Sequence, residues 1–311
     1  MRNKHLVIIL GPTAVGKTEL TIRLAKIYNS EIVSADSRQF YSELKTGTAV
    51  PTPAQLKEVP HHFIGHLHVT EYYNVSIYEN QLLSLLEDLF KKMEVVFMTG
   101  GSGLYIDVAC RGIDEFPTVT ATVRNKVLKQ YREMGLENLR GDLKNIDPDY
   151  YQSVDLNNPG RIMKALEIYL MTGRPYSTFL SKPQKNRPFS ILKIGLNIDR
   201  KLLYSRIDQR VDRMISAGLV DEARTVYRFK GTNALNTVGY KELFRYLEGA
   251  LTLEEAIILI KRNSRRYARR QITWFRKYPD ITWFTPDEQE QIVEYINTRT
   301  SRNDEDKSPK A

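Results

Sequence analysis

The sequence predicts an α/β protein in which crossover helices join the strands of a parallel sheet. Four short apolar runs are separated by longer helix-compatible stretches, which is the spacing expected of such a sheet. The runs are Leu6–Leu10, Glu31–Ser34, Val95–Thr99 and Ile191–Ile198. Because the interval before the last run is too long for one crossover, we also expect an inserted helical domain there.

The first run leads directly into a glycine-rich loop, and a helix-like segment follows the loop to Tyr28. The residues of this phosphate loop are Gly11, Pro12, Thr13, Ala14, Val15, Gly16, Lys17 and Thr18. In this context the glycines let backbone N–H groups surround phosphate oxygens, Lys17 adds a positive charge, and the Thr18 hydroxyl can hold a phosphate-bound Mg²⁺. The sequence therefore predicts a P-loop NTPase-like core that binds a diphosphate or triphosphate.

The insertion has helical patterns around Ala121–Met134 and Arg161–Met171, and proline-containing breakers flank it. Further elements continue the core in a helical C-terminal region. They are Lys201–Ala217, Val220–Phe229, Leu253–Phe275, the apolar run Ile281–Phe284 and a helix that begins near Pro286. The expected domains are a discontinuous core at 1–114 and 188–299, a helical insertion at 115–187 and a disordered polar tail at 300–311.

Composition limits the class of protein and its partners. The 311 residues are 41% hydrophobic and carry a formal net charge of +9, which favours a large anionic partner such as nucleic acid. The single cysteine, Cys110, leaves no thiolate cluster for zinc and no internal disulfide, so we expect a cytoplasmic protein. No apolar run approaches the roughly twenty residues that span a bilayer, so no membrane partner is expected. We expect a monomer.

One aspartate, Asp36, ends a predicted core strand. Ligands of open α/β sheets bind at the carboxyl ends of the strands, so Asp36 is expected beside the phosphate loop, as a general base or a metal ligand. Capping of the following turn is the alternative. Val95–Thr99 is instead followed by Gly100-Gly101-Ser102-Gly103, without the aspartate of phosphate-loop ATPases and GTPases.

Two groups of arginines point to anionic ligands. Six arginines near Leu253–Phe275 fall within one helical arc with no interleaved acids, and form either a solvated face or a surface for nucleic-acid phosphates. They are Arg262, Arg265, Arg266, Arg269, Arg270 and Arg276. After the fourth strand, Arg206 or Arg210 can reach the phosphate crevice and stabilise charge on a leaving group, or can pair with nearby acids instead. Those acids are Asp208 and Asp212.

Four of the five histidines lie between His61 and His68, so a zinc site has to be considered. The intervening Gly65 and the alternating apolar residues indicate a strand or loop that points the rings to different faces. We therefore favour a polar structural corner over a metal site.

Together these motifs resemble the tRNA dimethylallyltransferases, also called tRNA isopentenyltransferases. The matching segments run in order along nearly the whole chain. They are GPTAVGKT at 11–18, ADSRQFY at 35–41, GTAVPT at 47–52, PHHFI at 60–64, GGSGLY at 100–105, NPGRIMKALEIYLMTGRPYS at 158–177, TVGYKE at 237–242 and RRQITWFRK at 269–277. Jointly they are far more specific than the phosphate loop alone.

The resemblance implies that a dimethylallyl group moves from dimethylallyl diphosphate to the exocyclic amine of adenosine 37 in tRNA, with Mg²⁺ as cofactor. It implies that Asp36 accepts the proton of the amine, that Lys17 and Arg210 stabilise the diphosphate bound by the phosphate loop, and that Thr18 holds Mg²⁺. The implied tRNA contacts are Asp36, Ser37, Arg38, Gln39, Ser102, Arg124, Gly160, Arg161, Ile162, Met163, Lys164, Asn236, Thr237, Val238, Gly239, Tyr240, Lys241, Arg269, Arg270, Gln271 and Arg276.

Two positions depart from the family pattern. Gly160 replaces a glutamine that could contact RNA, and Gly65 replaces an aspartate that commonly follows the His-His-x-Ile element. From the residues alone, two other classes stay open. A phosphate-loop kinase of a small metabolite would not need the arginine helix, and a nucleic-acid-binding module with vestigial nucleotide binding would not need Asp36.

Overall fold

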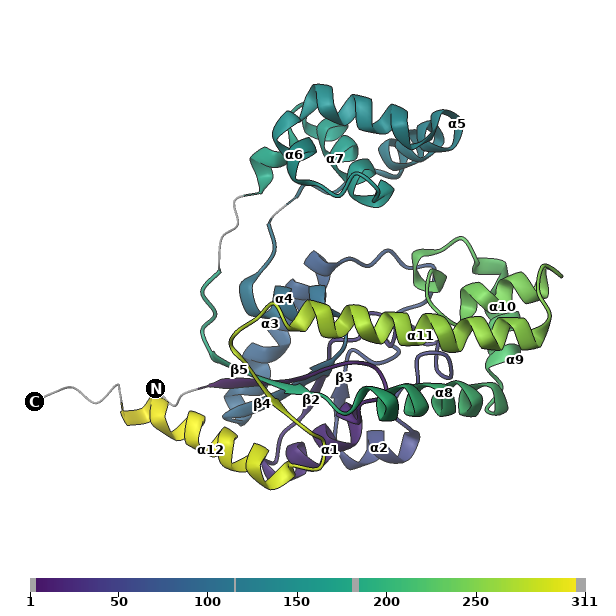
Figure 1. The fold of residues 1–311 in the computed structure, drawn as a ribbon. Coiled ribbons are helices and arrows are strands. Elements are labelled where there is room, and N and C mark those ends of the chain that lie inside the picture. The colour runs from purple at the N-terminus through teal and green to yellow at the C-terminus, as the bar shows by residue number, and fades with distance from the viewer. Residues whose placement is uncertain (1–3, 115, 181–184, 306–311) are drawn as a thin grey trace, which may run out of the picture. The chain divides into compact units, whose positions relative to one another are not determined.

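The computed structural model describes residues 4–114, 116–180 and 185–305. Within them, six parallel strands form one sheet in the order β3-β2-β4-β1-β5-β6 (Figure 1). The strands are β1 His5–Leu10, β2 Ile32–Ser34, β3 His61–His62, β4 Val95–Gly100, β5 Ser190–Leu196 and β6 Ile281–Phe284. The predicted α/β fold with a parallel sheet is confirmed, and each predicted apolar run contains a strand.

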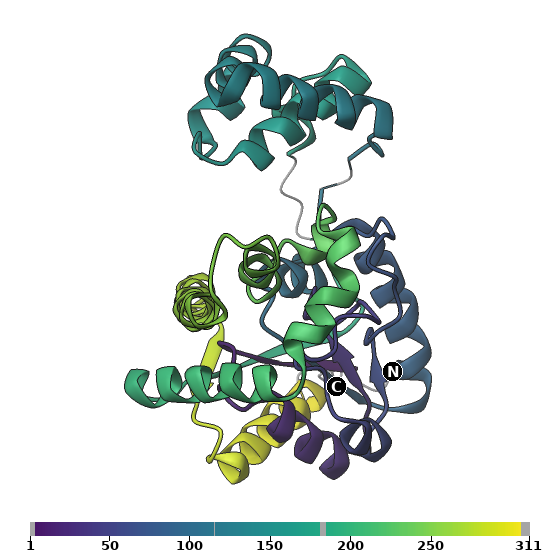
Figure 2. The ribbon, with the colours of Figure 1, turned by 90° about the vertical axis from the view of Figure 1, so that its right-hand side faces the viewer.

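The helices of the sheet-containing unit connect these strands and cover both faces of the sheet (Figure 2). They are α1 Lys17–Ile27, α2 Pro53–Glu58, α3 Val75–Lys92, α4 Gly103–Arg111, α8 Arg200–Ser216, α9 Leu219–Val226, α10 Tyr240–Leu247, α11 Leu253–Phe275 and α12 Gln289–Glu305, with 3₁₀ turns at Tyr227–Phe229 and Asn233–Leu235. The expected helix at Leu253–Phe275 has those same bounds, because a capping box of Thr252 and Glu255 fixes its start.

The sheet core is apolar on both sides. Leu6, Ile8 and Leu10 of β1 belong to one buried cluster, to which α3 and α4 also contribute. Val7 and Ile9 point to the opposite face and join a second cluster with α1 and α12. Because both faces are buried, β1 is an unbroken apolar run rather than an alternating one.

The helix α12 differs from the expected tail. It continues to Glu305, so the expectation of disorder from residue 300 is wrong for 300–305, while 306–311 lie outside the described residues. Buried Ile292 and Ile296 anchor this helix to the second cluster. Once a helix is nucleated, each added residue gains a backbone hydrogen bond, so a polar end can remain helical.

The chain divides into two compact units, which we call the core unit and the insertion unit. The core unit is Met1–Cys110 with Asn186–Ala311, and the insertion unit is Arg111–Lys185. The helices of the insertion unit are α5 Ala121–Ile146, α6 Pro148–Ser153, α7 Pro159–Thr172 and the 3₁₀ helix η1 Tyr176–Phe179. Gly135 has a φ of 75° and kinks α5 where the expected helix ends. The unit packs around a small apolar core of its own.

Over residues 4–114, 116–180 and 185–305, no helix has the length and apolar content that a bilayer crossing requires.

Candidate active site

The phosphate loop joins the carboxyl end of β1 to the start of α1. Gly11 and Gly16 have φ values of 148° and 109°, in the region that favours glycine. A Cβ at Gly11 would lie 2.5 Å from the carbonyl oxygen of Leu196 in β5, so no larger residue fits there. The loop ends at the N-terminus of α1, where free backbone N–H groups and the helix dipole attract anions. The local backbone is therefore suited to surround a phosphate group.

Lys17 lies over this loop. Its Nζ donates to the carbonyl oxygens of Gly11 at 3.0 Å and Pro12 at 2.8 Å. Desolvation and, to a smaller extent, the positive charge of Arg210 lower the pKa of Lys17 to about 7, although the Asp36 carboxylate opposes the shift. These electrostatic interactions bring together three of the expected catalytic residues.

Arg210 extends from α8 toward the same crevice. Its Nη2 donates to the Thr48 carbonyl oxygen at 3.3 Å, and burial lowers its pKa while Asp36 opposes that shift. Arg206, one turn earlier, donates to the Val15 carbonyl oxygen at 3.5 Å. The two arginines therefore face the phosphate loop and its surroundings.

The acids considered as their alternative partners instead bind side chains of α11. Asp208 accepts from Arg265, and Asp212 pairs with Lys261. Because these acids pair with α11, they do not compete for Arg210, which stays available for its expected role beside the phosphate loop.

Asp36 follows β2 at the carboxyl edge of the sheet. Its Oδ1 accepts from the backbone N–H of Arg38 at 3.0 Å, so the carboxylate does cap the turn that follows it. The same carboxylate interacts electrostatically with Lys17 and Arg210. Turn capping and a place in the crevice are therefore compatible.

The glycine segment Gly100–Gly103 brings the end of β4 close to the other loops. A Cβ at Gly100 would lie 2.4 Å from the Ala35 carbonyl oxygen, and one at Gly103 would lie 2.4 Å from the Trp274 ring. The Ser102 Oγ accepts from the Ser37 N–H at 3.1 Å. Positions 100 and 103 are glycine because neighbouring chain segments occupy the space that any side chain there would need.

The arginine face of α11 is mostly as expected. Five of its members are exposed: Arg262, Arg266, Arg269, Arg270 and Arg276. Arg265 differs, because it is half-buried and paired with Asp208 of the neighbouring helix α8. No acid is interleaved among these arginines within α11, and the acidic partner of Arg265 comes from another helix, which the sequence pattern of α11 does not show. Gln271 also differs, because its side chain is 6% exposed and points away from the face.

The segment Asn236–Lys241 is only partly open. Tyr240 is fully buried, and its hydroxyl donates to Glu222 at 2.6 Å. The side chain of Tyr240 therefore does not offer the expected tRNA contact. Asn236 and Lys241 line a surface hollow of about 340 Å³ together with Lys230, Gly231, Thr232, Asn233, Leu235 and Phe244.

Two other expected tRNA contacts have structural roles within the core unit. Arg38 Nη1 donates to the Asn233 carbonyl oxygen at 2.6 Å. Gln39 Nε2 donates to the carbonyl oxygens of Thr48 at 3.3 Å and Ala49 at 3.2 Å. Both side chains connect the loop after β2 to more distant parts of the chain.

The insertion unit carries the remaining expected contacts. Ile162 is fully buried in the apolar core of this unit, and Met163 packs against that core, because both lie on the inner face of α7. Gly160 and Arg161 are exposed in the first turn of α7. Arg124 lies 3.9 Å from Glu167, and Lys164 lies over the Phe116 ring.

Glu222 was not singled out in the sequence, yet it binds the backbone that leads into the GTAVPT segment. Its carboxylate accepts from the backbone N–H groups of Lys45 at 3.0 Å, Thr46 at 2.8 Å and Gly47 at 2.8 Å, in addition to the Tyr240 hydroxyl. Glu222 connects Gly47 of the GTAVPT motif with Tyr240 of the TVGYKE motif. No local sequence pattern around Glu222 indicates these contacts.

The histidines have separate partners. His62 contacts Glu31 at 2.6 Å, His68 contacts Glu43 at 2.8 Å, and His66 packs edge-on against Phe40. Among the described residues, no three His, Cys, Asp or Glu side chains gather as metal ligands. These contacts are those of a structural corner.

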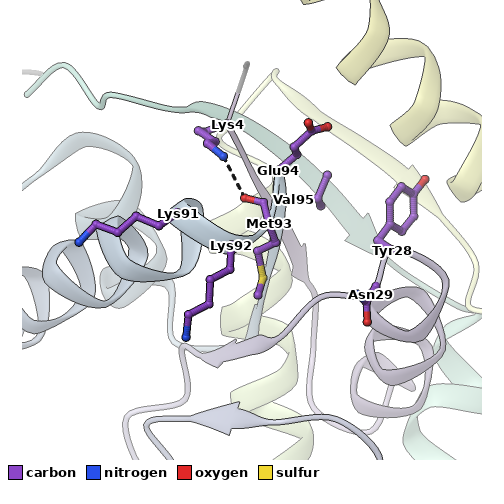
Figure 3. A pocket seen from close by; sticks show the side chains of 8 residues that line it. All are labelled: Lys4, Tyr28, Asn29, Lys91, Lys92, Met93, Glu94 and Val95. Atoms are coloured by element: carbon purple, nitrogen blue, oxygen red, sulfur yellow. Dashed lines mark hydrogen bonds between the residues drawn. The ribbon is translucent and has the colours of Figure 1, made fainter. Parts of the chain in front are cut away.

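A second hollow of about 340 Å³ lies at the opposite, amino end of the strands (Figure 3). It is lined by Lys4, Tyr28, Asn29, Lys91, Lys92, Met93, Glu94 and Val95. Lys4 donates to the Met93 carbonyl oxygen, whereas Lys91 points away from Lys4 and pairs with Asp88. The cations of this hollow therefore do not converge on a common anion.

Comparison with known proteins connects this geometry to a family. The model of the family described as IPP transferase matches residues 39–278. The chain is 52% identical to tRNA dimethylallyltransferase 1 of Bacteroides fragilis, over 95% of this chain and 98% of that protein. It is 53% identical to tRNA dimethylallyltransferase 1 of Bacteroides thetaiotaomicron, over 94% of each chain.

A solved structure shows the same fold. The full-length tRNA isopentenylpyrophosphate transferase of Bacillus halodurans superposes with a TM-score of 0.72 at 34% identity. The match covers 97% of this chain and 98% of that one. The likeness therefore includes the core unit and the insertion unit alike.

Proposed function

This chain belongs to the IPP transferase family and is a prenyltransferase that transfers a dimethylallyl group to adenosine 37 of tRNA, and we propose that its donor is dimethylallyl diphosphate. One observation carries the proposal for the donor. Lys17 and Arg210 place two cations at the phosphate loop, and Asp36 interacts with both. A diphosphate bound by this loop would relieve the repulsion between the cations and leave the carboxylate for the acceptor.

The proposed reaction exchanges one bond to carbon for another. The exocyclic nitrogen of the adenosine attacks the allylic carbon, the carbon–oxygen bond to the diphosphate breaks, and the diphosphate leaves with the bonding electron pair. Asp36 accepts the proton that the nitrogen loses. Lys17 and Arg210 stabilise the negative charge that develops on the departing diphosphate.

Mg²⁺ suits the chemistry of this site. Thr18 is half-buried in the first turn of α1, and its hydroxyl is a hard oxygen donor beside the phosphate loop. Mg²⁺ is commonly bound through one or two protein oxygens together with phosphate oxygens. We propose that Thr18 would hold the ion, which would neutralise part of the diphosphate charge.

The exposed arginines of α11 support a surface for the phosphates of the tRNA. Arg269 and Arg270 lie on the same helix as Gln271, which contacts the phosphate loop. Phosphate contacts position a nucleic acid without reading its sequence, and their binding energy can offset the few kcal/mol needed to unstack the target base. We further propose that the protein acts as a monomer in the cytoplasm, where its tRNA acceptor is found.

A transfer assay tests the proposed function. The purified protein is incubated with unmodified tRNA, Mg²⁺ and labelled dimethylallyl diphosphate, and the tRNA is digested to nucleosides. We expect label in isopentenyladenosine at position 37. Absence of label from the RNA would overturn dimethylallyl diphosphate as the donor.

A further inference from the structure

We propose that Gln271 is a positioning residue for the phosphate loop and does not contact tRNA through its side chain. This inference rests on the proposed function, because it concerns how the loop holds the diphosphate of the donor. It also separates Gln271 from the exposed arginines beside it in the sequence.

Gln271 connects three segments of the core unit. Its Oε1 accepts from the backbone N–H of Thr13 in the phosphate loop at 2.9 Å. Its Nε2 donates to the Gly101 carbonyl oxygen, also at 2.9 Å, in the segment that follows β4. One side chain of α11 therefore ties the phosphate loop to the end of a neighbouring strand.

The orientation of this amide is fixed by the polarity of its partners. A backbone N–H can only donate and a backbone carbonyl can only accept, so a rotated amide would face a donor with its NH₂ group and an acceptor with its oxygen. Both ends of the side chain are engaged, and the residue is 6% exposed. Arg269 and Arg270, immediately before it in α11, are exposed instead.

The sequence leaves space for this contact. A Cβ at Gly101 would lie 2.1 Å from the Gln271 Nε2, closer than real Cβ contacts occur, so the amide reaches the Gly101 carbonyl only because position 101 is glycine. The second glycine of the GGSG segment and the glutamine of the RRQITW segment thus act together.

Gln271 acts on the peptide group that Lys17 also contacts. The N–H of Thr13 and the carbonyl of Pro12 belong to one planar peptide unit. Gln271 binds the N–H of this unit, and Lys17 Nζ donates to its oxygen at 2.8 Å. Gln271 therefore sets the orientation of a carbonyl that holds Lys17 at the entrance of the phosphate loop. Loss of the amide would free this peptide to rotate and would disorder the Lys17 ammonium that has to meet the diphosphate.

The test uses Gln271→Met, which keeps the length of the side chain and removes both hydrogen bonds. Three quantities are measured on the full protein: the Kd of inorganic diphosphate with Mg²⁺ by titration calorimetry, the KM for dimethylallyl diphosphate, and the Kd of unmodified tRNA. We expect the diphosphate Kd and the KM for dimethylallyl diphosphate to rise about tenfold, since two buried backbone groups lose their partner. The tRNA Kd should stay within about twofold of the native value. Gln291→Met, the same change at an exposed position of α12, is the matched control and should alter neither.

A second variant keeps the inference testable if Gln271→Met does not fold. Gly101→Ala displaces the amide without changing it and should weaken diphosphate binding in the same way, and the double variant should be no weaker than either single variant. A raised tRNA Kd with an unchanged diphosphate Kd would make Gln271 an RNA contact and overturn the proposal. Diphosphate binding needs no prenyl transfer, so a native protein that binds diphosphate but fails the transfer assay would count against the proposed function only.

Discussion

At the scale of single residues, the protonated form of Lys17 in the crevice is one that a bound anion would stabilise. Lys17 donates to two backbone carbonyl oxygens, while desolvation and the charge of Arg210 lower its pKa to about 7. A bound diphosphate supplies negative charge, which favours the protonated amine. Binding above pH 7 therefore has to bring a proton with it.

We expect diphosphate affinity to fall as the pH rises above about 7. The free protein loses the Lys17 proton above that pKa, and the complex requires it, so the Kd should rise by up to about tenfold per pH unit. Titration calorimetry at pH 6.5, 7.5 and 8.5 measures the effect. In Lys17→Arg the guanidinium stays protonated at all three pH values. Protonation of the diphosphate itself affects both proteins equally, so the difference between their pH profiles reports on Lys17. Parallel pH profiles for the native protein and this variant would contradict the expectation.

Asp36 offers a second test at the same scale. Asp36→Asn keeps an oxygen for the Arg38 N–H but cannot take up a proton, so kcat should fall by roughly a hundredfold or more. The tRNA Kd should change by less than about twofold. Single-turnover transfer to saturating tRNA measures the loss, and Asp221→Asn, at an exposed acid of α9, is the control. Turnover at the native rate in Asp36→Asn would remove Asp36 from the role of base.

At the scale of elements, local patterns predicted five of the six described strands, the phosphate loop and α11, whereas contacts between elements were not predictable. The strand β1 follows from an apolar run and α11 from helical periodicity, and both signals depend on nearby residues. The pairing of Arg265 with Asp208 links positions 57 residues apart, and the bond from Thr13 to Gln271 links positions 258 apart. Such partners depend on how α8 and α11 pack, so the sequence could predict neither the acidic partner of Arg265 nor the contact of Gln271 with the phosphate loop.

The exposed part of the arginine face carries its own prediction. Replacing Arg269 and Arg270 with alanine removes two cations, so the tRNA Kd should rise about tenfold and the slope of log Kd against log salt should become shallower by about 1 to 2. Filter binding across a salt series measures both quantities. Diphosphate binding should not change. The matched control, Arg23→Ala with Arg299→Ala, removes the same charge from α1 and α12, and a similar effect there would show that net charge alone drives binding.

At the scale of the whole molecule, the chain leaves the core unit after Cys110 and returns to it at Asn186. The sequence placed these crossings within a few residues from proline breakers and helix patterns. It did not predict how the returning segment is fixed. Arg187 pairs with Glu79 at 2.7 Å and also donates to the carbonyl oxygens of Val108 and Ala109 in α4. Glu79 lies 108 residues away in sequence, so no local pattern connects it with Arg187.

This buried pair should determine the stability of the core unit. The side chains of Arg187 and Glu79 are 5% and 3% exposed, so Arg187→Met takes this cation away from a buried carboxylate and should cost about 3–5 kcal/mol of unfolding free energy. Both tryptophans, Trp274 and Trp283, lie in the core unit, and their fluorescence during urea unfolding reports on that unit. Arg224→Met breaks an exposed pair and should cost less than about 1 kcal/mol.

A double variant separates the effect of the buried charge of Glu79 from the effect of losing the other contacts of Arg187. Adding Glu79→Leu to Arg187→Met also removes the buried carboxylate that has lost this cation, so the double variant should regain much of the lost stability, because an apolar pair of similar volume avoids desolvating two ions. If the single variant unfolds at the native urea concentration, the ion pair does not fix the returning chain. If the double variant is no more stable than the single one, the bonds from Arg187 to Val108 and Ala109 fix it instead, since these are the contacts that both variants lack.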